Sequence, residues 1–205
     1  MKVVLQNLTK IFPSRDKKSG KEVVAVNDFT FEIPDGKLIG LLGPSGCGKS
    51  MTLRCIAGVA RPDRGHIEVN GVTLFDSEKG IDLPPQERSV GLLFQNYALF
   101  PHMTVEQNLR TVMRGLPRRE ADRRAESMLR RFHLEDRRSH LPRQLSGGEQ
   151  QRIAIARSLL NDPTVIIADE PTGNLDNETA DGIMKLLTGI NKEKGTAIVM
   201  VTHNR

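Results

Sequence analysis

The sequence predicts an α/β fold built on a parallel β-sheet, with an antiparallel β layer at the N-terminus and an inserted helical lobe. Apolar runs of strand length alternate with helical patterns along most of the 205 residues, an order typical of a parallel sheet covered by helices. Residues 3–33 depart from this order because they hold two strand-like runs with no helix between them. Residues 97–145 depart from it because they hold helical patterns and no strand. We expect residues 1–205 to form one domain, with the lobe at about residues 97–145.

The antiparallel layer is predicted by two runs near the start of the chain. Residues 3–12 form an apolar run, and residues 29–33 alternate apolar and polar side chains, as a strand with one face in water does. The polar and basic segment 13–21 between them is typical of a hairpin loop. The turn at residues 34–36 then leads into the next strand.

A strand at residues 37–42 leads into a phosphate-binding pattern, G-x-x-x-x-G-K-[ST], which residues 43–50 match at every fixed position. Glycine lets consecutive backbone N–H groups turn towards one point, and the positive end of the helix expected at residues 51–59 faces the same point. We expect Lys49 to reach the β and γ phosphates of a nucleotide and the Ser50 hydroxyl to bind Mg²⁺. A glycine-rich turn that binds nothing is the alternative. The predicted phosphate-contacting residues are Gly43, Pro44, Ser45, Gly46, Cys47, Gly48, Lys49 and Ser50.

Two further strands follow the first helix. Residues 66–71 end in the Asn-Gly pair that is typical of a hairpin, and residues 89–94 form an apolar run that ends at Gln95. A polar side chain at the carboxyl end of a central parallel strand points into the ligand crevice, so Gln95 is a candidate binding residue. The segment from Tyr97 to Val105 is apolar and contains a proline. It is either a docking face for another protein or a loop folded into the local core.

The lobe is predicted by helical spacing at residues 104–134, where Pro117 separates two helices. Arginines and acidic residues are interleaved along it, which usually indicates a solvated helix face. Binding of nucleic acid through these arginines is the less favoured alternative. Further helices are expected to begin near Glu149, after the small-residue turn at residues 145–148, and to span residues 178–190.

Two buried strands complete the predicted sheet. Residues 164–168 end at Asp169 and Glu170, and residues 195–201 lead to His203. Two adjacent carboxylates at a strand end are costly unless a cation or a bound water uses them. Asp169 is therefore a candidate Mg²⁺ ligand, directly or through water, and Glu170 is a candidate general base. Because parallel strands share one carboxyl edge, we expect these side chains to lie together beside the phosphate loop.

The composition is that of an ordinary soluble protein, and we expect a cytoplasmic location. An apolar content of 38% with 27% charged residues excludes a disordered chain, and the longest apolar runs, such as residues 197–201, are too short to span a bilayer. The net charge of +5 permits contact with nucleic acid or an anionic membrane, but the absence of Trp argues against a base-stacking surface. The two cysteines, Cys47 and Cys55, suit reduced thiols better than a disulfide framework.

The segment after the lobe carries the most specific motif. Residues 145–152, Leu-Ser-Gly-Gly-Glu-Gln-Gln-Arg, make the sequence resemble the nucleotide-binding domain of ATP-binding cassette (ABC) transporters over essentially its whole length. Phosphate loops occur in many ATPases, whereas this octet after a helical lobe does not. In the same comparison Asp169-Glu170 resembles the Walker B pair, Gln95 the Q-loop glutamine, Asn174-Leu-Asp176 the D-loop, His203 the switch histidine and Phe12 the base-stacking aromatic. By its position alone, Phe12 is better explained by core packing.

The resemblance implies a P-loop NTPase fold with a RecA-like sheet core, and ATP hydrolysis with ATP and Mg²⁺ as cofactors. It implies that two domains pair head to tail, as a homodimer or as two paired cassettes. The turn at Ser146, Gly147 and Gly148 of one domain would then contact the γ-phosphate held by Lys49 of the other. That turn opens a helix and has no obvious phosphate of its own within one chain, which agrees with this assignment.

The resemblance also assigns roles to single residues. Glu170 would polarise the attacking water, and His203 would hydrogen-bond the γ-phosphate or the water. Mg²⁺ would be bound by Ser50, Gln95 and Asp169, and nucleotide contacts would extend to Phe12, Met51, Gln95 and Asp176.

Membrane partners are a further implication of the resemblance. ATP binding would close the dimer and hydrolysis would reopen it. Gln95 would pass this movement to the surface from Tyr97 to Val105, where transmembrane permease subunits would dock. The protein would then power transport from the cytoplasm, peripherally bound to the inner face of the cell membrane, with no nucleic acid as a partner.

Two departures from the family pattern lead to further expectations. Met51 stands where the family usually has Thr, which removes a hydroxyl near the α-phosphate, so we expect weaker nucleotide affinity. The chain stops at Arg205, two residues beyond His203, whereas the family continues. We therefore expect His203 to be weakly held and a sheet edge to be uncovered.

The resemblance to subfamilies is mixed. Residues 83–101 resemble importer cassettes for sugars, polyamines, sulfate or molybdate, whereas residues 168–176 and 201–204 resemble cell-division and lipoprotein-release cassettes. Substrate contacts belong to the membrane subunits, so the transported substrate does not follow. Two alternatives remain: a non-transport ABC ATPase that acts on a division complex or nucleic acid, and a truncated or recombined cassette with weak turnover.

Overall fold

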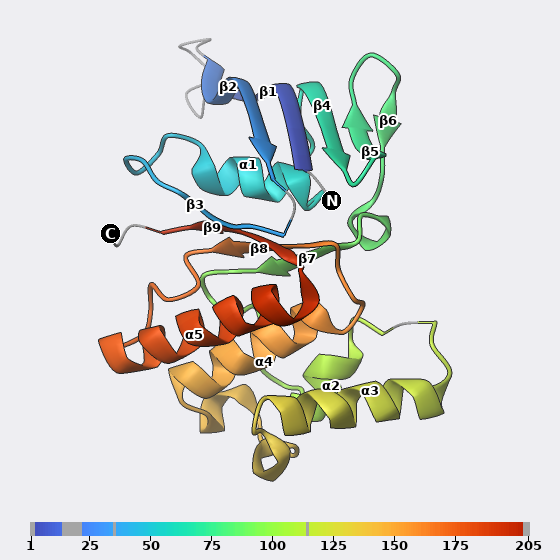
Figure 1. The fold of residues 1–205 in the computed structure, drawn as a ribbon, viewed down its shortest axis with the longest axis vertical. Helices are drawn as coiled ribbons and strands as arrows, with labels where there is room; N and C mark the ends of the chain where they lie inside the picture. The colour runs from blue at the N-terminus through green and yellow to red at the C-terminus, as the bar shows by residue number, and fades with distance from the viewer. Residues whose placement is uncertain (1–2, 14–21, 35, 114, 203–205) are drawn as a thin grey trace.

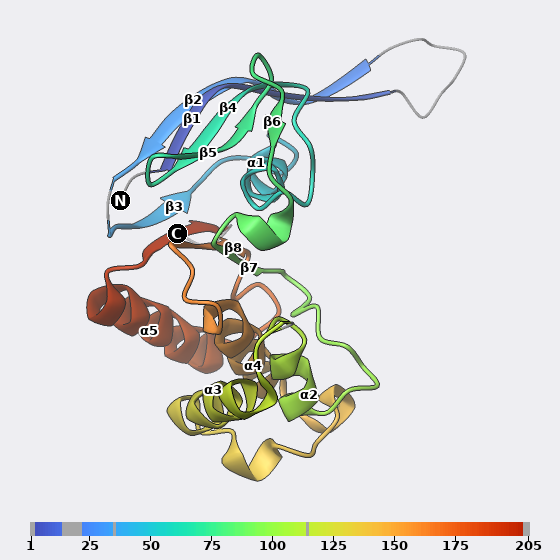
Figure 2. The same ribbon diagram turned by 90° about the vertical axis from the view of Figure 1, so that its right-hand side faces the viewer.

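The computed structural model describes residues 3–13, 22–34, 36–113 and 115–202 (Figure 1). These residues form an antiparallel sheet with the strand order β2-β1-β4-β5-β6 and a parallel sheet with the order β3-β9-β8-β7. Helix α1 lies between the two sheets, while α4 and α5 cover the other face of the parallel sheet and the lobe helices α2 and α3 lie beyond them (Figures 1 and 2). The predicted α/β fold, with its antiparallel layer and inserted helices, is confirmed.

The antiparallel sheet is larger than the sequence predicted, because the strands after α1 join it. The second strand begins at residue 22 rather than 29. Of the loop expected at 13–21, Pro13 is the last residue of β1 and the rest lies outside the described residues. Asn70 and Gly71 both have positive φ, 53° and 77°, and form the predicted hairpin turn between β4 and β5. The strands are β1 (Val3–Pro13), β2 (Glu22–Ile33), β4 (Arg64–Val69), β5 (Val72–Asp76) and β6 (Ile81–Asp82).

The parallel sheet contains the four strands that the apolar runs predicted. They are β3 (Leu38–Leu41), β7 (Val90–Leu93), β8 (Val165–Asp169) and β9 (Ala197–Val201). Every residue of β8 and β9 is buried, as is usual for strands that have helices on both faces of their sheet. Strand β9 lies between β3 and β8, so within the described residues β3 and β7 are the edges of this sheet.

Two helices begin two residues earlier than the sequence indicated. Helix α1 begins at Lys49, inside the phosphate-binding pattern, and α4 begins at Gly147 because Ser146 is its N-cap. Within the described residues no helix has the length and apolar character needed to cross a membrane. The helices are α1 (Lys49–Ile56), α2 (Val105–Arg110), α3 (Arg118–Arg131), α4 (Gly147–Leu159) and α5 (Asn177–Lys194), and the short 3-10 turns are η1 (Pro85–Glu87), η2 (Glu135–Arg137) and η3 (Pro142–Gln144).

Hydrophobic cores on both faces of the parallel sheet fix the position of its carboxyl edge. Ile167 and Val199 belong to the core that contains α1 and the antiparallel sheet. Ile166 and Ile198, their neighbours in sequence, belong to the core shared by α4, α5 and the lobe. This alternation follows from the period of two in a strand. The ends of β8 and β9 are therefore held from both sides.

Candidate functional site

The loop between β3 and α1 has the geometry of a phosphate cradle. Gly48 has φ +90°, and a Cβ at this position would lie 2.2 Å from the carbonyl oxygen of Ala25, so only glycine fits. Lys49 Nζ donates to the carbonyl oxygens of Gly43 at 2.7 Å and Pro44 at 2.8 Å, which holds the ammonium group over the loop. The N-cap of α1 is Gly48, which has no side chain with which to cap the helix N-terminus. The positive end of the helix therefore meets the loop without a protein carboxylate or hydroxyl in the cap position, which suits an anion.

The phosphate loop is joined directly to the end of β8. Ser50 Oγ donates to Asp169 Oδ1 at 2.6 Å, and Arg54 Nη2 lies 3.8 Å from Asp169 Oδ2. Asp169 is only 5% exposed, so a hydroxyl and a carboxylate oxygen meet in a sheltered place beside the cradle. Hard cations such as Mg²⁺ prefer this pair of oxygen ligands.

The donor set fits a cation that takes few protein ligands. Among the described residues, no three His, Cys, Asp or Glu side chains gather closely enough to hold a metal ion by themselves. Mg²⁺ is usually bound by one or two protein oxygens together with substrate phosphates and water. Ser50 and Asp169 beside a phosphate cradle match that pattern.

Glu170 is held in an unusual backbone conformation and aimed by its neighbours. Its φ is +50°, a left-handed value that is uncommon for a residue with a side chain and that is found often at functional sites. Gln95 Nε2 donates to Glu170 Oε2 at 3.0 Å, and Asn174 Nδ2 donates to the carbonyl oxygen of Gln95 at 2.9 Å. Gly173 packs so closely that an added Cβ would lie 3.1 Å from Glu170 Oε2. The structure thus brings the predicted residues Gln95, Asp169 and Glu170 to one edge of the sheet.

His203 lies outside the described residues. The chain approaches it from β9, whose Val201 pairs with Asp169 and accepts a hydrogen bond from the backbone N–H of Glu170 at 3.0 Å. Thr202, half-buried, is the last described residue.

The turn at residues 145–148 begins α4 and is closed by its own side chains. Ser146 Oγ accepts from the N–H of Glu149 at 3.2 Å, and the N–H of Ser146 donates to Glu149 Oε2 at 2.8 Å, which is a capping box. The backbone N–H of Ser146, followed by Arg137, lowers the pKa of Glu149. A Cβ on Gly148 would lie 2.6 Å from Thr179 Cγ2, so a larger residue here would displace the Thr179 side chain where α4 meets the start of α5.

Asp176, the predicted D-loop residue, is the N-cap of α5. Its Oδ1 accepts from the N–H of Thr179 at 2.9 Å, and this backbone hydrogen bond lowers the pKa of the carboxyl group. Asp176 therefore lies at the same helix end that packs against the Gly148 turn.

Phe12 is not a core residue, so the core-packing interpretation is wrong. Its side chain is 38% exposed, and Lys10 Nζ lies 5.1 Å from the ring centroid. Phe12 pairs with Val23 in the β1–β2 hairpin, two residues from the Ala25 carbonyl that touches the phosphate loop. The ring is thus on the strand pair that borders the cradle.

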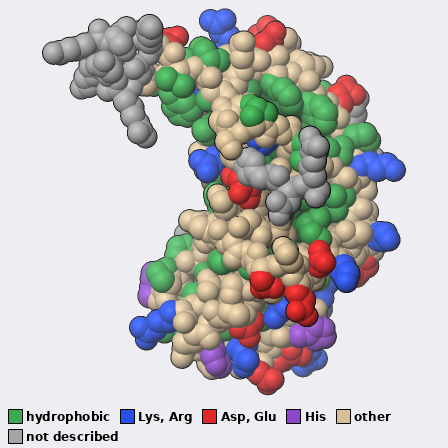
Figure 3. Space-filling view, turned by 90° about the vertical axis from the view of Figure 1, so that its left-hand side faces the viewer, with side chains coloured by type: hydrophobic (Ala, Val, Ile, Leu, Met, Phe, Trp, Pro, Cys, Tyr) green, Lys and Arg blue, Asp and Glu red, His purple; other side chains and the backbone are tan. Residues whose placement is uncertain are grey.

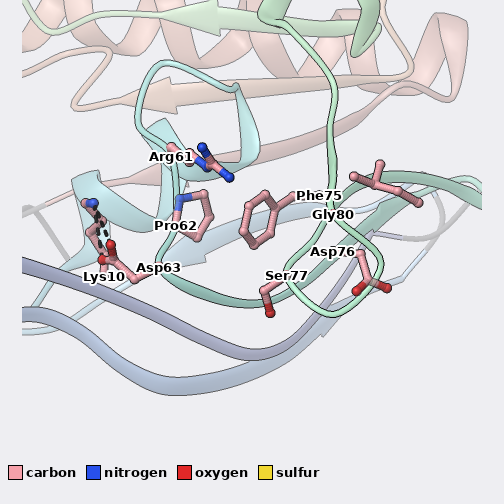
Figure 4. A pocket seen from close by; sticks show the side chains of 9 residues that line it. Lys10, Arg61, Pro62, Asp63, Phe75, Asp76, Ser77 and Gly80 are labelled. Carbon is pink, nitrogen blue, oxygen red and sulfur yellow. Dashed lines mark hydrogen bonds and ion pairs between the residues drawn. The ribbon is translucent and has the colours of Figure 1, made fainter.

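The ammonium group of Lys10 is held in place by an ion pair with Asp63. Lys10 Nζ lies 3.2 Å from Asp63 Oδ2, and that carboxylate also accepts from the N–H of Ile11 at 2.6 Å. A cavity of about 360 Å³ opens beside this pair, with Pro62 and Phe75 in its wall (Figure 4). None of its lining residues belongs to the phosphate loop.

A family model identifies the chain: the model described as ABC transporter matches residues 26–173. This chain belongs to the ABC transporter family. The matched span contains the phosphate loop, Gln95, the Ser146 turn and both carboxylates of the β8 end. ABC cassettes bind ATP together with Mg²⁺, and the oxygen ligands beside the cradle fit that pair.

Named ABC relatives match most of the chain. The trehalose/maltose import ATP-binding protein MalK of Thermococcus litoralis is 40% identical over 186 residues, which are 90% of this chain and 50% of MalK. The spermidine/putrescine import ATP-binding protein PotA of Acidothermus cellulolyticus is 40% identical over 205 residues, which are 99% of this chain and 51% of PotA. The chain spans about half the length of these curated relatives. Among solved structures, the dimeric ATP-binding cassette MJ0796 bound to ADP and Pi has a TM-score of 0.82 and 34% identity, covering 98% of this chain and 88% of that one.

The apolar segment from Tyr97 to Val105 fits both interpretations in part. Tyr97 and Leu99 pack against the core, whereas Phe100 is 43% exposed. Arg157 on α4 donates to the carbonyl oxygens of Tyr97 at 3.1 Å and Ala98 at 2.8 Å, which fixes the segment to the cassette. A groove of about 700 Å³ runs along it, lined also by β7 and α4.

Sequence reasoning missed two structural arginines of this ABC cassette, one partly buried and one buried. Arg157 holds the segment just described, and Arg88 is only 2% exposed and binds backbone carbonyls beside α1. Each of them donates to carbonyl oxygens that lie dozens of residues away in the sequence, although Arg88 also bonds the nearby Leu83 and Asp82. The type of a residue and the pattern of its sequence neighbours do not predict hydrogen bonds to such distant partners.

Proposed function

We propose that this chain is the ATP-binding and ATP-hydrolysing subunit of an ABC importer, with residues 1–205 acting as one nucleotide-binding domain. The observation that carries the proposal is the 2.6 Å hydrogen bond from Ser50 to Asp169, which joins the phosphate loop to the acidic end of β8 across 119 residues of sequence. A phosphate cradle with Mg²⁺ ligands and a carboxylate base at one sheet edge is suited to phosphoryl transfer to water. The relatives MalK and PotA are named as import ATP-binding proteins, which supports the importer role.

Each side chain at this edge has a role in the proposed hydrolysis of ATP. Lys49 and the amides of residues 43–50 hold the β and γ phosphates, so Lys49 exchanges its loop carbonyls for phosphate oxygens. Ser50 and Asp169, with Gln95, would hold Mg²⁺, which would neutralise phosphate charge. Glu170 accepts a proton as the water oxygen bonds to the γ-phosphorus, while the bond from that phosphorus to the ADP oxygen breaks.

The remaining site residues complete the nucleotide contacts in this proposal. His203 hydrogen-bonds the γ-phosphate or the water, and Phe12 stacks on the base. Met51, Gln95 and Asp176 border the nucleotide.

We propose that the reaction centre is completed by a second cassette. The Ser146–Gly148 turn points its helix end at the γ-phosphate held by Lys49 of a head-to-tail partner, which closes the pair around two ATP molecules. The dimeric MJ0796 cassette, to which this chain is similar over 98% of its length, supports this arrangement. The face with the phosphate loop and the end of β9 is indented between the halves of the molecule (Figure 3).

A permease is the proposed membrane partner, docked on the segment from Tyr97 to Val105. The exposed ring of Phe100 and the groove of about 700 Å³ beside it offer an apolar element a place to insert. Gln95, which binds Glu170 through its side chain and Asn174 through its carbonyl, lies between this surface and the base. The protein would accordingly be bound at the cytoplasmic face of the membrane.

Ion pairing on the lobe disfavours the nucleic-acid alternative. Glu120 pairs with Arg123 at 2.7 Å and with Arg124 at 2.8 Å, and Glu126 pairs with Arg130 at 2.8 Å. Basic and acidic side chains are intermixed over the helical half of the face in Figure 3. Positive charge that is neutralised in this way gives a weak electrostatic footprint for a phosphate backbone.

The proposed function is tested by phosphate release and by membrane association. The purified chain should release phosphate from ATP only with Mg²⁺, and Lys49→Ala should abolish release while Lys192→Ala, an exposed lysine on α5, should not. Expressed with its host membranes, the chain should co-purify with a polytopic partner in high salt. Equal turnover by Lys49→Ala and the unaltered chain would refute the enzyme proposal. Recovery with nucleic acid in place of membranes would refute the transport role.

A further inference from the structure

The buried guanidinium of Arg88 has no role in the proposed hydrolysis. Arg88 follows η1, lies just before β7 and is 2% exposed. A buried charge is costly unless all of its donors find partners. All three nitrogens of Arg88 do, because Nε donates to the carbonyl oxygen of Leu83 at 2.7 Å, Nη1 to Cys55 and Ile56, and Nη2 to Asp82 Oδ1 at 2.9 Å.

Two of these bonds end on the helix whose other end is the phosphate loop. Nη1 donates to the carbonyl oxygens of Cys55 at 2.8 Å and Ile56 at 3.1 Å, in the last turn of α1. The last carbonyls of a helix lack intrahelical donors, and a cation there is favoured by the helix dipole. Helix α1 has 8 residues, so its length is about 12 Å. The carbonyls that bind Arg88 are therefore only about two turns from Lys49 and Ser50.

The other bonds of Arg88 join α1 to the rest of the molecule. Asp82 ends β6 of the antiparallel sheet, and Leu83 follows it. Strand β7 begins two residues after Arg88 and leads to Gln95. One guanidinium thus connects the antiparallel sheet, the phosphate-loop helix and the strand that leads to the Glu170 partner.

Gly58 is shaped for this guanidinium. It has φ +76°, and an added Cβ would lie 2.5 Å from Arg88 Nε and 2.9 Å from Cζ. A glycine just beyond the end of α1 therefore serves two purposes, since it ends the helix and leaves room for the planar group. This gives a second way to disturb the contact without changing Arg88 itself.

We propose that Arg88 is a positioning residue for the nucleotide site. It fixes the C-terminal end of α1 against the start of β7. This contact determines the positions of Lys49 and Ser50 relative to Gln95 and Glu170. The consequence for nucleotide affinity rests on the proposed function, whereas the consequence for the mobility of α1 does not. A guanidinium is suited to this task because its planar fork reaches four acceptors in fixed directions, which an ammonium group cannot do.

The test compares four variants with the unaltered chain. Arg88→Met removes all four hydrogen bonds, Arg88→Lys keeps the charge and loses the fork, and Gly58→Ala pushes the guanidinium aside. Leu129→Ala, in the buried face of α3, is the control for a general loss of stability. All measurements are made at a temperature at which circular dichroism shows every variant folded.

Two readouts separate positioning from general stability. Hydrogen exchange of the α1 amides should accelerate at least tenfold in Arg88→Met and Gly58→Ala, and not in Leu129→Ala. The dissociation constant for Mg²⁺-ADP should rise about tenfold in Arg88→Met, which loses all four hydrogen bonds, and about threefold in Arg88→Lys, which keeps the charge. Leu129→Ala should bind as the unaltered chain does.

Each outcome decides a different point. Unchanged α1 exchange in the Arg88 and Gly58 variants would overturn the inference, whatever their thermal stability. The same holds if Leu129→Ala changes both readouts as strongly as Arg88→Met. Failure of the unaltered chain to bind Mg²⁺-ADP would overturn the proposed function, and the exchange data would still decide whether Arg88 holds α1.

Discussion

The N-termini of α1 and α4 are both small-residue turns that open a helix, yet their cap positions differ. The α1 turn has Gly48 as its N-cap, with no side chain bonded to the first amides, and Lys49 lies over it. The α4 turn is closed by Ser146 and Glu149, which bond each other's backbone N–H groups. The first turn therefore offers a phosphate a positive and open pocket. The second offers a helix end that already contains a carboxylate.

This difference suggests that the first turn can bind a phosphate within one chain, whereas the second turn needs a phosphate that is bound elsewhere. In the proposed function, a phosphate at the first turn would gain a lysine, the proposed Mg²⁺ ligands and the proposed base within one chain. A phosphate at the second turn would gain only the helix end and the Ser146 hydroxyl, and would lie close to Glu149. The second turn is therefore useful only against a phosphate that is already neutralised elsewhere, as in a head-to-tail pair. This asymmetry can be tested.

The largest expected effect is on turnover in Glu170→Gln. Loss of the base should lower the hydrolysis rate about 100- to 1000-fold, the range found for general bases, while ATP still binds at the first turn. Because the pair no longer reopens, size-exclusion chromatography with Mg²⁺-ATP should show a dimer. Glu178→Gln, an exposed acid in the first turn of α5, is the matched control and should hydrolyse normally. A monomer of undiminished activity would show that Glu170 is not the base.

Ser146→Asp compares the two turns directly. Aspartate caps a helix as well as serine does, so α4 should keep its stability, but a second carboxylate now faces the partner's phosphate. Binding of ATP to a single chain should be unchanged, and hydrolysis should fall roughly tenfold because closing of the pair is opposed. Binding is measured at low concentration by fluorescence and hydrolysis at high concentration by phosphate release. Weakened binding by the monomer would mean that the second turn already contacts nucleotide within one chain.

Acid should weaken the lobe by removing the contribution of the Glu106 carboxylate. Arg138, and after it Arg110, lowers the pKa of Glu106 to about 2, from a usual value of 4.5. A lowered folded-state pKa gives stability that is present above the unfolded pKa and is lost as the pH falls from about 4.5 towards 2. Arg138 is 43% exposed, so solvent screens this pair and the contribution is modest.

Glu106→Gln isolates that contribution. It should lower the thermal midpoint by roughly 2–4 °C at pH 7, the shift expected for about 1 kcal/mol in a chain of this size. The difference from the unaltered chain should shrink as the pH falls below 4.5. Glu135→Gln, in the exposed η2 turn beside Arg138, is the control. A difference that persists unchanged at pH 3 would show that Glu106 acts through packing and not through its charge.

The first turn could be predicted from the sequence more fully than the second. The pattern at residues 43–50 specifies its own backbone, because Gly48 is needed for the left-handed φ and Lys49 and Ser50 follow at fixed spacing. The strand periodicity placed Gln95, Asp169 and Glu170 at one edge, and the hydrogen bonds from Ser50 and Gln95 agree with that. These predictions succeeded because local pattern and strand direction determine them.

Other features depend on contacts that no local pattern records. The reach of Arg88 to the end of α1, and the joining of β4 to β1 in one antiparallel sheet, follow from how distant segments pack. The exposure of Phe12 depends on the hairpin that carries it. The closing of the second turn by the Ser146–Glu149 capping box was not predicted from the sequence, and its meaning for phosphate binding comes from comparison with the first turn.

The smallest expected effect concerns the hydroxyl that the first turn lacks. Met51 stands next to Ser50 and packs partly against the core, so no hydroxyl follows Ser50 directly. Thr52 does not replace it, because its hydroxyl donates to the carbonyl oxygen of Gly48 at 3.1 Å and the residue is 4% exposed. Thr52 therefore does not compensate for the weaker nucleotide affinity that we expect from Met51.

Met51→Thr should tighten Mg²⁺-ADP binding about two- to threefold. A new hydrogen bond to the α-phosphate favours binding, and the methionine packing lost from α1 offsets part of the gain. Thr52→Val should leave the dissociation constant unchanged, since it removes a hydroxyl that is turned into the helix. Calorimetric titration of both variants decides the matter. If Thr52→Val weakens binding while Met51→Thr has no effect, then Thr52 turns outward to meet the phosphate, and the first turn is less preorganised than its comparison with the second implies.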